Sequence, residues 1–200
     1  MNNIKSNSYT EKEKQELFNK LKKASKLFGL KISIEEDRRS NNSGATIDTQ
    51  TISMGLKWDD SNSKKFGMLE TNEAICDNID NYHKQFPYED FIKYPFLIKV
   101  FMHEVAHLLT VSMDDIALYK KEVSELASSK DMNSQEKQLA YRKVSFEKLA
   151  DNLAYELIYQ NYDMIIKILL GKRTRITKSR ISKNTKIAKE FRAKYIEEVA

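Results

Sequence analysis

Two histidines four residues apart, with a glutamate directly after the first, are the side chains of this sequence best suited to chemistry. They are His103, Glu104 and His107, in the string Phe-Met-His-Glu-Val-Ala-His-Leu-Leu. Positions i and i+4 of a helix share a face, so both imidazoles can bind one ion at the roughly 2.0 to 2.1 Å that zinc requires. Glu104 faces elsewhere and can serve as general base on a water at the open side of the metal. The spacing predicts a zinc site.

The surroundings of this pair favour a buried helix from Pro95 to about Ser112. Apolar residues surround the two histidines on nearly every side of the predicted helix. Burying two imidazoles and a carboxylate is costly unless they have partners, and a metal ion with its water would supply them. The alternative is that ordinary hydrogen bonds satisfy both histidines and that the helix has only a structural role.

A third protein ligand is expected, because catalytic zinc usually takes three and leaves one position for water. His83, the one other histidine, lies in a polar run and is expected on the surface. Glu147 lies in the most apolar part of a later helix, and Asp151, one turn further on, can orient a ligand histidine through its free N–H. Two alternatives remain open: Glu156 is the ligand, or Glu147 forms a surface ion pair with Arg142 or Lys143.

Two motifs resemble those of the ImmA/IrrE type of zinc metallopeptidase. The first is His103-Glu104-x-x-His107, and the second is Glu147-x-x-Ala150-Asp151-x-Leu-Ala-x-x-Leu157-Ile158. The resemblance covers residues from about 45 to 160. It implies a zincin-like metalloprotease fold, Zn²⁺ as cofactor, Glu147 as a zinc ligand and Asp151 beside a ligand histidine. The implied activity is hydrolysis of peptide bonds in a specific protein partner, with Glu104 as general base.

The elements that must position these residues are mostly helical. Capping-box spacing at Thr10 and Glu13 predicts a helix that ends at Gly29. Alternating residues predict a strand over 30–34 and a second strand region over 50–57 with Ile52 and Met54 on one face, separated by a loop over 37–45. Further helices are expected over 71–83, 115–129, 133–160 and 161–170. The fold class is therefore α+β, mainly helical, with a small N-terminal sheet packed on the helix of the histidine pair.

The strand over 50–57 precedes the histidine helix, as the substrate-binding edge strand of zincin folds commonly does. We expect this segment to pair with the backbone of a peptide substrate by strand addition. Tyr155 is the nearest candidate for a residue that stabilises the oxyanion, with core packing as the alternative.

The net charge of +5 is concentrated at the C-terminal end. Residues 171–200 carry ten Lys or Arg against three Glu, so residues 1–170 are nearly neutral. We expect a metallopeptidase domain over 1–170 and a basic helical tail over 171–200. Residues 172–194 of that tail can contact nucleic acid or an acidic partner, or they form a solvated helix.

Composition narrows the compartment. The single Cys76 excludes an intrachain disulfide and fits a reducing compartment. The sequence has no apolar stretch long enough to span a bilayer and no apolar signal segment at its start. We therefore expect a cytoplasmic protein, and the richness in Lys, Asn and Ile indicates a low-G+C bacterium or its phage. The alternative function is a zincin-fold binding or structural protein of a phage or mobile element, associated with the host cytoplasm or the virion, that uses its basic tail for assembly.

Overall fold

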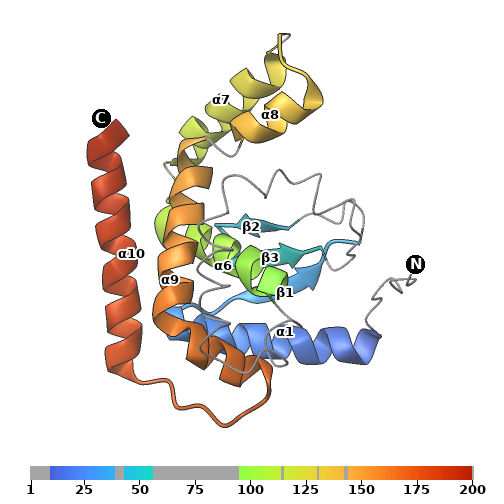
Figure 1. Cartoon of the computed structure of the whole chain (residues 1–200), viewed down its shortest axis with the longest axis vertical. Coiled ribbons are helices and arrows are strands. Elements are labelled where there is room, and N and C mark those ends of the chain that lie inside the picture. Colours follow the sequence, from blue (N-terminus) through green and yellow to red (C-terminus); the bar gives the residue numbers. More distant parts are fainter. Residues whose placement is uncertain are drawn as a thin grey trace, which may run out of the picture.

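The computed structural model describes residues 10–38, 43–55, 95–113, 115–129, 131–141 and 144–199. Over these residues the chain is mostly helical and contains one small three-stranded sheet (Figure 1). This agrees with the predicted α+β class and with the N-terminal place of the sheet. The helix predicted over 71–83 and His83 itself lie outside the described residues.

Helix α1 (Glu11–Ser25) begins where the sequence predicts and ends four residues before the predicted stop at Gly29. Thr10 forms the capping box with Glu13, in which each residue's backbone N–H is bound by the other's side chain. A short 3-10 turn, η1 (Lys26–Phe28), follows, and Gly29 then adopts a left-handed φ of 75° that stops the helix. A Cβ at Gly29 would also lie 3.2 Å from the side chain of Ile181. The turn at Gly29 is therefore in close contact with the helix that contains Ile181, near the C-terminal end of the described chain.

The sheet has the strand order β1-β3-β2. Strand β1 (Ser33–Glu36) runs parallel to β3 (Thr51–Met54), and β2 (Gly44–Thr46) runs antiparallel to it. The first strand begins three residues later than predicted, and β2 overlaps the end of the segment predicted as a loop. Ile52 and Met54 are both fully buried, as their alternation predicts.

The predicted role of residues 50–57 as a substrate-binding edge strand is wrong for β3. Over Thr51–Met54 this strand is hydrogen-bonded to β1 on one side and to β2 on the other. Its backbone groups are therefore already paired and cannot accept a further strand. The prediction failed because the weak three-residue strand β2 carries no pattern of alternating apolar residues.

Four helices follow in the middle of the described chain. They are α6 (Pro95–Thr110), α7 (Asp115–Ser128), α8 (Ser134–Tyr141) and α9 (Ser145–Leu169). The prediction of one long helix over 133–160 was wrong, because the backbone at Val144 is extended (φ −54°, ψ 134°) and separates α8 from α9. The predicted boundary at Asn161 was also wrong, because α9 continues through it. Asn133 and Glu136 have capping-box spacing, and they form the reciprocal hydrogen bonds of a capping box at the start of α8.

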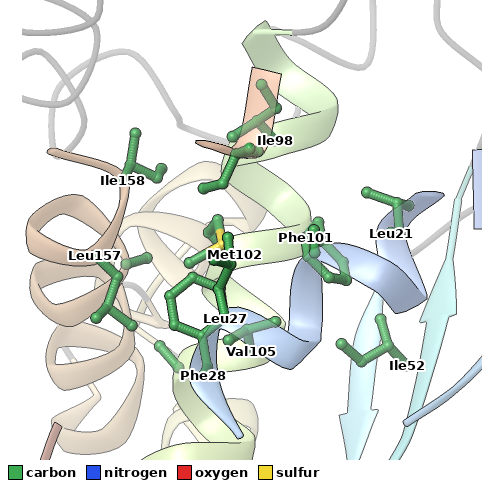
Figure 2. Packing of buried hydrophobic residues seen from close by; sticks show 14 of the residues in the cluster. Leu21, Leu27, Phe28, Ile52, Ile98, Phe101, Met102, Val105, Leu157 and Ile158 are labelled. Carbon is green, nitrogen blue, oxygen red and sulfur yellow. The ribbon is translucent and has the colours of Figure 1, made fainter. Parts of the chain in front are cut away.

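The hydrophobic core lies where α1, α6, α9 and the sheet meet (Figure 2). Helix α6 contributes Ile98, Phe101, Met102 and Val105 to its centre, each at most 1% exposed. Because α6 packs against both the sheet and α9, it is covered on several sides. This packing explains why apolar residues surround the two histidines of α6. It also fixes the position of the histidine pair.

The basic segment predicted as a tail forms helix α10 (Lys178–Val199), which runs beside α9 (Figure 1). Its inner face reaches the core: Ala188 and Asn184 are 2% and 1% exposed. Asn184 donates a hydrogen bond to the carbonyl of Leu27 and exchanges a reciprocal pair with Asn161 of α9. The division into a domain of 1–170 and a tail stays a prediction. None of the helices among the described residues has the length and apolar character needed to cross a membrane.

Candidate metal centre

Helix α6 presents His103 and His107 on one face, one turn apart. Their Nε2 atoms lie 3.0 Å from each other, and the two rings stand nearly perpendicular, at 87°. His103 is 9% exposed. The two nitrogens thus point at a common position at the surface of the core.

Glu147, in the first turn of α9, brings a carboxylate to the same position. Its Oε2 lies 3.2 Å from Nε2 of His103, and its Oε1 lies 3.5 Å from Nε2 of His107. Ala150 and Ala154 are fully buried on α9, and their small side chains allow this helix to lie close to α6. The predicted juxtaposition of the three side chains is therefore present.

The geometry of these three donors fits a metal ion. Ligand atoms 2.0 to 2.1 Å from a tetrahedral zinc are about 3.3 to 3.4 Å from one another. The two nitrogens lie 3.0 Å apart, and their shortest separations from the carboxylate are 3.2 Å to Oε2 and 3.5 Å to Oε1, all within about 0.4 Å of that value. Two imidazoles and a carboxylate are also a donor set that transition metals use. The group can hold a metal ion, with one nitrogen from each histidine and one oxygen from Glu147.

Asp151 holds His103 from the other side of its ring. Its Oδ1 lies 2.8 Å from Nδ1 of His103. An ionised carboxylate only accepts hydrogen bonds, so Nδ1 carries the proton and the lone pair of a neutral His103 lies on Nε2. This is the tautomer that a metal ligand needs, and Asp151 therefore occupies the position expected for a residue that orients a ligand histidine.

The charges around His103 favour the protonated form of its ring. Burial lowers the pKa of His103, but hydrogen bonds to Asp151 and Glu147 and the charge of Glu104 outweigh it and raise the pKa to about 10. Burial raises the pKa of Glu147, but its contacts with the two histidines dominate and hold that pKa well below its usual range. A buried cluster rich in carboxylates thus attracts positive charge, whether a proton or a metal ion.

Glu104 is buried beside the pair, at 5% exposure. Its negative charge contributes to raising the pKa of His103 on α6 and also the pKa of Tyr119 on α7, where burial is the larger cause. Glu104 therefore places a buried negative charge near both side chains, and it is not one of the three residues that could hold the ion.

The sequence left two alternatives for the third ligand, a surface position of Glu147 and Glu156 as the ligand. A surface position for Glu147 is excluded, because the residue is 3% exposed and faces the histidines. Arg142 and Lys143, its predicted ion-pair partners, lie outside the described residues. Glu156 lies partly buried further along α9 and accepts a hydrogen bond from Gln160. It is not part of the cluster that could hold a metal.

Two tyrosines at the site were missed by the sequence analysis. The hydroxyls of Tyr119 on α7 and Tyr141 on α8 lie 2.9 and 2.7 Å from Oε1 of Glu147. Tyr155, the predicted candidate, is partly buried and packs against the core. The only signal for Tyr119 is its place on the inner face of its helix with Ile116 and Val123, and Tyr141 has no comparable signal.

No protein-family model, curated protein or solved structure matches the chain. What the site can do is therefore inferred from its own residues and their geometry.

Proposed function

We propose that this protein is a zinc-dependent peptidase whose zinc ligands are His103, His107 and Glu147. The observation that carries the proposal is the convergence of these three side chains, from two helices, at separations that fit a tetrahedral ion. Zinc is the metal proposed because two imidazoles and one carboxylate form a common set for catalytic zinc that leaves a fourth position open. The two motifs that resemble ImmA/IrrE-type metallopeptidases contain all three ligands, which supports the same assignment.

The chain's own residues then divide the work of hydrolysis. A zinc ion at this site would acidify a water molecule and polarise the carbonyl of a peptide bond. Glu104 would take the proton of that water and pass it to the leaving amine, because it is the buried carboxylate beside the ligands that is not one of them. Asp151 would keep Nε2 of His103 unprotonated and correctly oriented. The expected substrate is a protein or peptide in a reducing compartment, which the single Cys76 favours.

The test compares zinc content with cleavage. Elemental analysis of the wild type should give about one zinc per chain, and Glu147→Ala should lose most of it. Glu104→Gln is the matched control, since it keeps the size and the ligands but removes the base. It should bind zinc normally and lose cleavage of host proteins by about 10²- to 10⁴-fold.

Two outcomes would decide against the peptidase. A wild-type protein that binds no zinc under non-chelating conditions would end the metal proposal. A protein that binds zinc but shows no cleavage that depends on Glu104 would favour the alternative, a binding or structural protein on the same scaffold.

A second candidate function, nucleic-acid binding, is favoured by the outer face of α10 and the residues before it. Eight exposed cations lie there: Lys172, Arg173, Arg175, Lys178, Lys183, Lys186, Lys189 and Lys194. Deleting α10 cannot test this role, because its inner face is part of the core. Reversal of Lys178, Lys186 and Lys189 to Glu should instead lower affinity for duplex DNA and flatten its salt dependence, by a slope of about 0.9 per lost phosphate contact. Equal binding by wild type and variant would exclude this face.

A further inference from the structure

The carboxylate of Glu147 meets two hydroxyls that come from a different part of the chain. Tyr119 lies on α7 and Tyr141 on α8, and both hydroxyls approach the same oxygen, Oε1, at 2.9 and 2.7 Å. The two hydroxyls also lie 2.6 Å from each other. Three oxygens from three helices therefore form one closed group at the edge of the candidate metal centre.

The number of available protons limits the hydrogen bonds that these three oxygens can form. Each phenol has one proton to donate, and the carboxylate oxygen Oε1 of Glu147 is the acceptor. Two protons cannot serve three contacts at once. Either both tyrosines donate to Oε1, or one donates to the other, which donates to Oε1. In each arrangement at least one hydroxyl binds Oε1.

Both oxygens of the carboxylate face the histidines. Oε2 lies 3.2 Å from Nε2 of His103, and Oε1, which the tyrosines bind, lies 3.5 Å from Nε2 of His107. We propose that Tyr119 and Tyr141 are positioning residues that hold the carboxylate of Glu147, through Oε1, in the orientation in which it faces both histidines. This inference rests on the proposed metal site and specifies how its third ligand is held.

The neighbouring packing keeps both tyrosines in place. The ring of Tyr119 contacts the ring of Phe146, the residue before Glu147, edge to face at 6.5 Å between centroids. On the other side of Phe146, the hydroxyl of Ser145 donates to Glu122 of α7 at 2.6 Å. The two residues directly before Glu147 thus bind the first turn of α9 to α7, which limits the rotamers that Glu147 can adopt.

The test is metal binding by the whole chain, with zinc affinity and the Co²⁺ absorption spectrum as readouts. Tyr119→Phe/Tyr141→Phe should bind zinc about 10- to 100-fold more weakly, the usual loss when a residue that supports a ligand is removed. Without the two hydroxyls the carboxylate of Glu147 can turn, so the geometry around bound Co²⁺, and with it the visible absorption bands, should change. Tyr159→Phe, on the exposed face of α9, is the matched control and should change neither readout.

The outcomes separate this inference from the proposed function. If the wild type binds no metal, the site itself fails. If the wild type binds zinc and the double variant binds it with the same affinity and the same Co²⁺ spectrum, the positioning role is overturned and the metal site stands. If the double variant does not fold, the single variants decide: each keeps one donor and should lose a few-fold in affinity, and no change in either would overturn the role.

Discussion

At the scale of single residues, the site gathers two buried carboxylates, of Glu104 and Glu147, and the partly buried carboxylate of Asp151 around two imidazoles. Carboxylates at such density repel one another unless a cation lies among them. The arrangement therefore favours a cation in their midst, either a protonated His103 or a metal ion.

The contact between Asp151 and His103 predicts different losses of zinc affinity for two substitutions of Asp151. Asp151→Ala removes the acceptor of the Nδ1 proton and should weaken zinc binding by about 10- to 100-fold. Asp151→Asn keeps an oxygen in the same place without its charge, so its loss should be smaller. Competition with a chromophoric zinc chelator measures both dissociation constants. Equal and unchanged constants in the two variants would contradict the role of Asp151.

The predictability of these residues depends on how far apart they lie in the sequence. His103, Glu104 and His107 form a local pattern, and Glu147 with Asp151 forms another, so helical periodicity was enough to place each set. Tyr119 and Tyr141 reach Glu147 only because α7 and α8 fold back over the start of α9. No spacing in the sequence indicates such a contact, and for this reason Tyr155 was predicted instead.

At the scale of elements, the end of α6 is held by α10 through one arginine. Arg192 donates to the carbonyl of Thr110, the last residue of α6, and pairs with Asp115 of α7 at 2.7 Å. Asp115 also accepts hydrogen bonds from the backbone N–H and the hydroxyl of Ser112. The link between the histidine helix and the helix of Tyr119 is thus fixed by a third helix.

This junction predicts a loss of stability in acid. Burial raises the pKa of Asp115, but hydrogen bonds from Ser112 and the contact with Arg192 outweigh it and hold the pKa below its ordinary 3.8. The folded protein therefore binds this proton less readily than the unfolded chain does, so the stabilisation is complete well above pH 3.8 and is lost as the pH falls through the folded-state pKa. The variant Asp115→Asn lacks this stabilisation at every pH. In urea titrations, the gap in unfolding free energy between wild type and variant should narrow below about pH 4, and a constant gap would contradict this.

Element boundaries were predictable where local chemistry fixes them. The capping boxes at Thr10 and Asn133 and the left-handed Gly29 are local signals, and the structure has all three. The break at Val144 and the strand β2 depend on tertiary contacts, since the sequence at Val144 has no helix breaker and the three residues of β2 have no alternating pattern. They are also the elements that decide the site: the break lets Tyr141 turn back towards Glu147, and β2 covers the edge of β3.

At the scale of the whole molecule, a buried pair of amides joins the two ends of the described chain. Asn161 and Asn184 exchange hydrogen bonds at 3.0 and 3.1 Å, and Asn184 also donates to the carbonyl of Leu27 at 2.8 Å. Composition indicated only that the C-terminal segment is basic. It could not show that the opposite face of the same helix closes the core, because that requires knowing which surface the helix meets.

Asn184→Ala should therefore destabilise the entire fold. It leaves the side chain of Asn161 and the carbonyl of Leu27 without their partner in a buried place, at a cost of about 1 to 3 kcal/mol. Urea unfolding followed by circular dichroism gives the free energy. Ser182→Ala, on the exposed side of the same helix, should change stability by less than about 0.5 kcal/mol. Similar values for the two variants would show that the amide pair contributes nothing.

The contact between Asn184 and Leu27 also sets an order of events during synthesis. The two partners are 157 residues apart, and a chain leaves the ribosome at about 5 to 20 residues per second. For roughly 8 to 30 seconds the carbonyl of Leu27 waits for its donor, and the end of α6, which is 82 residues before Arg192, waits about half as long. A nascent chain thus contains both histidines before it has the helix that holds the end of α6, so the frame of the candidate metal centre is complete only after α10 has emerged.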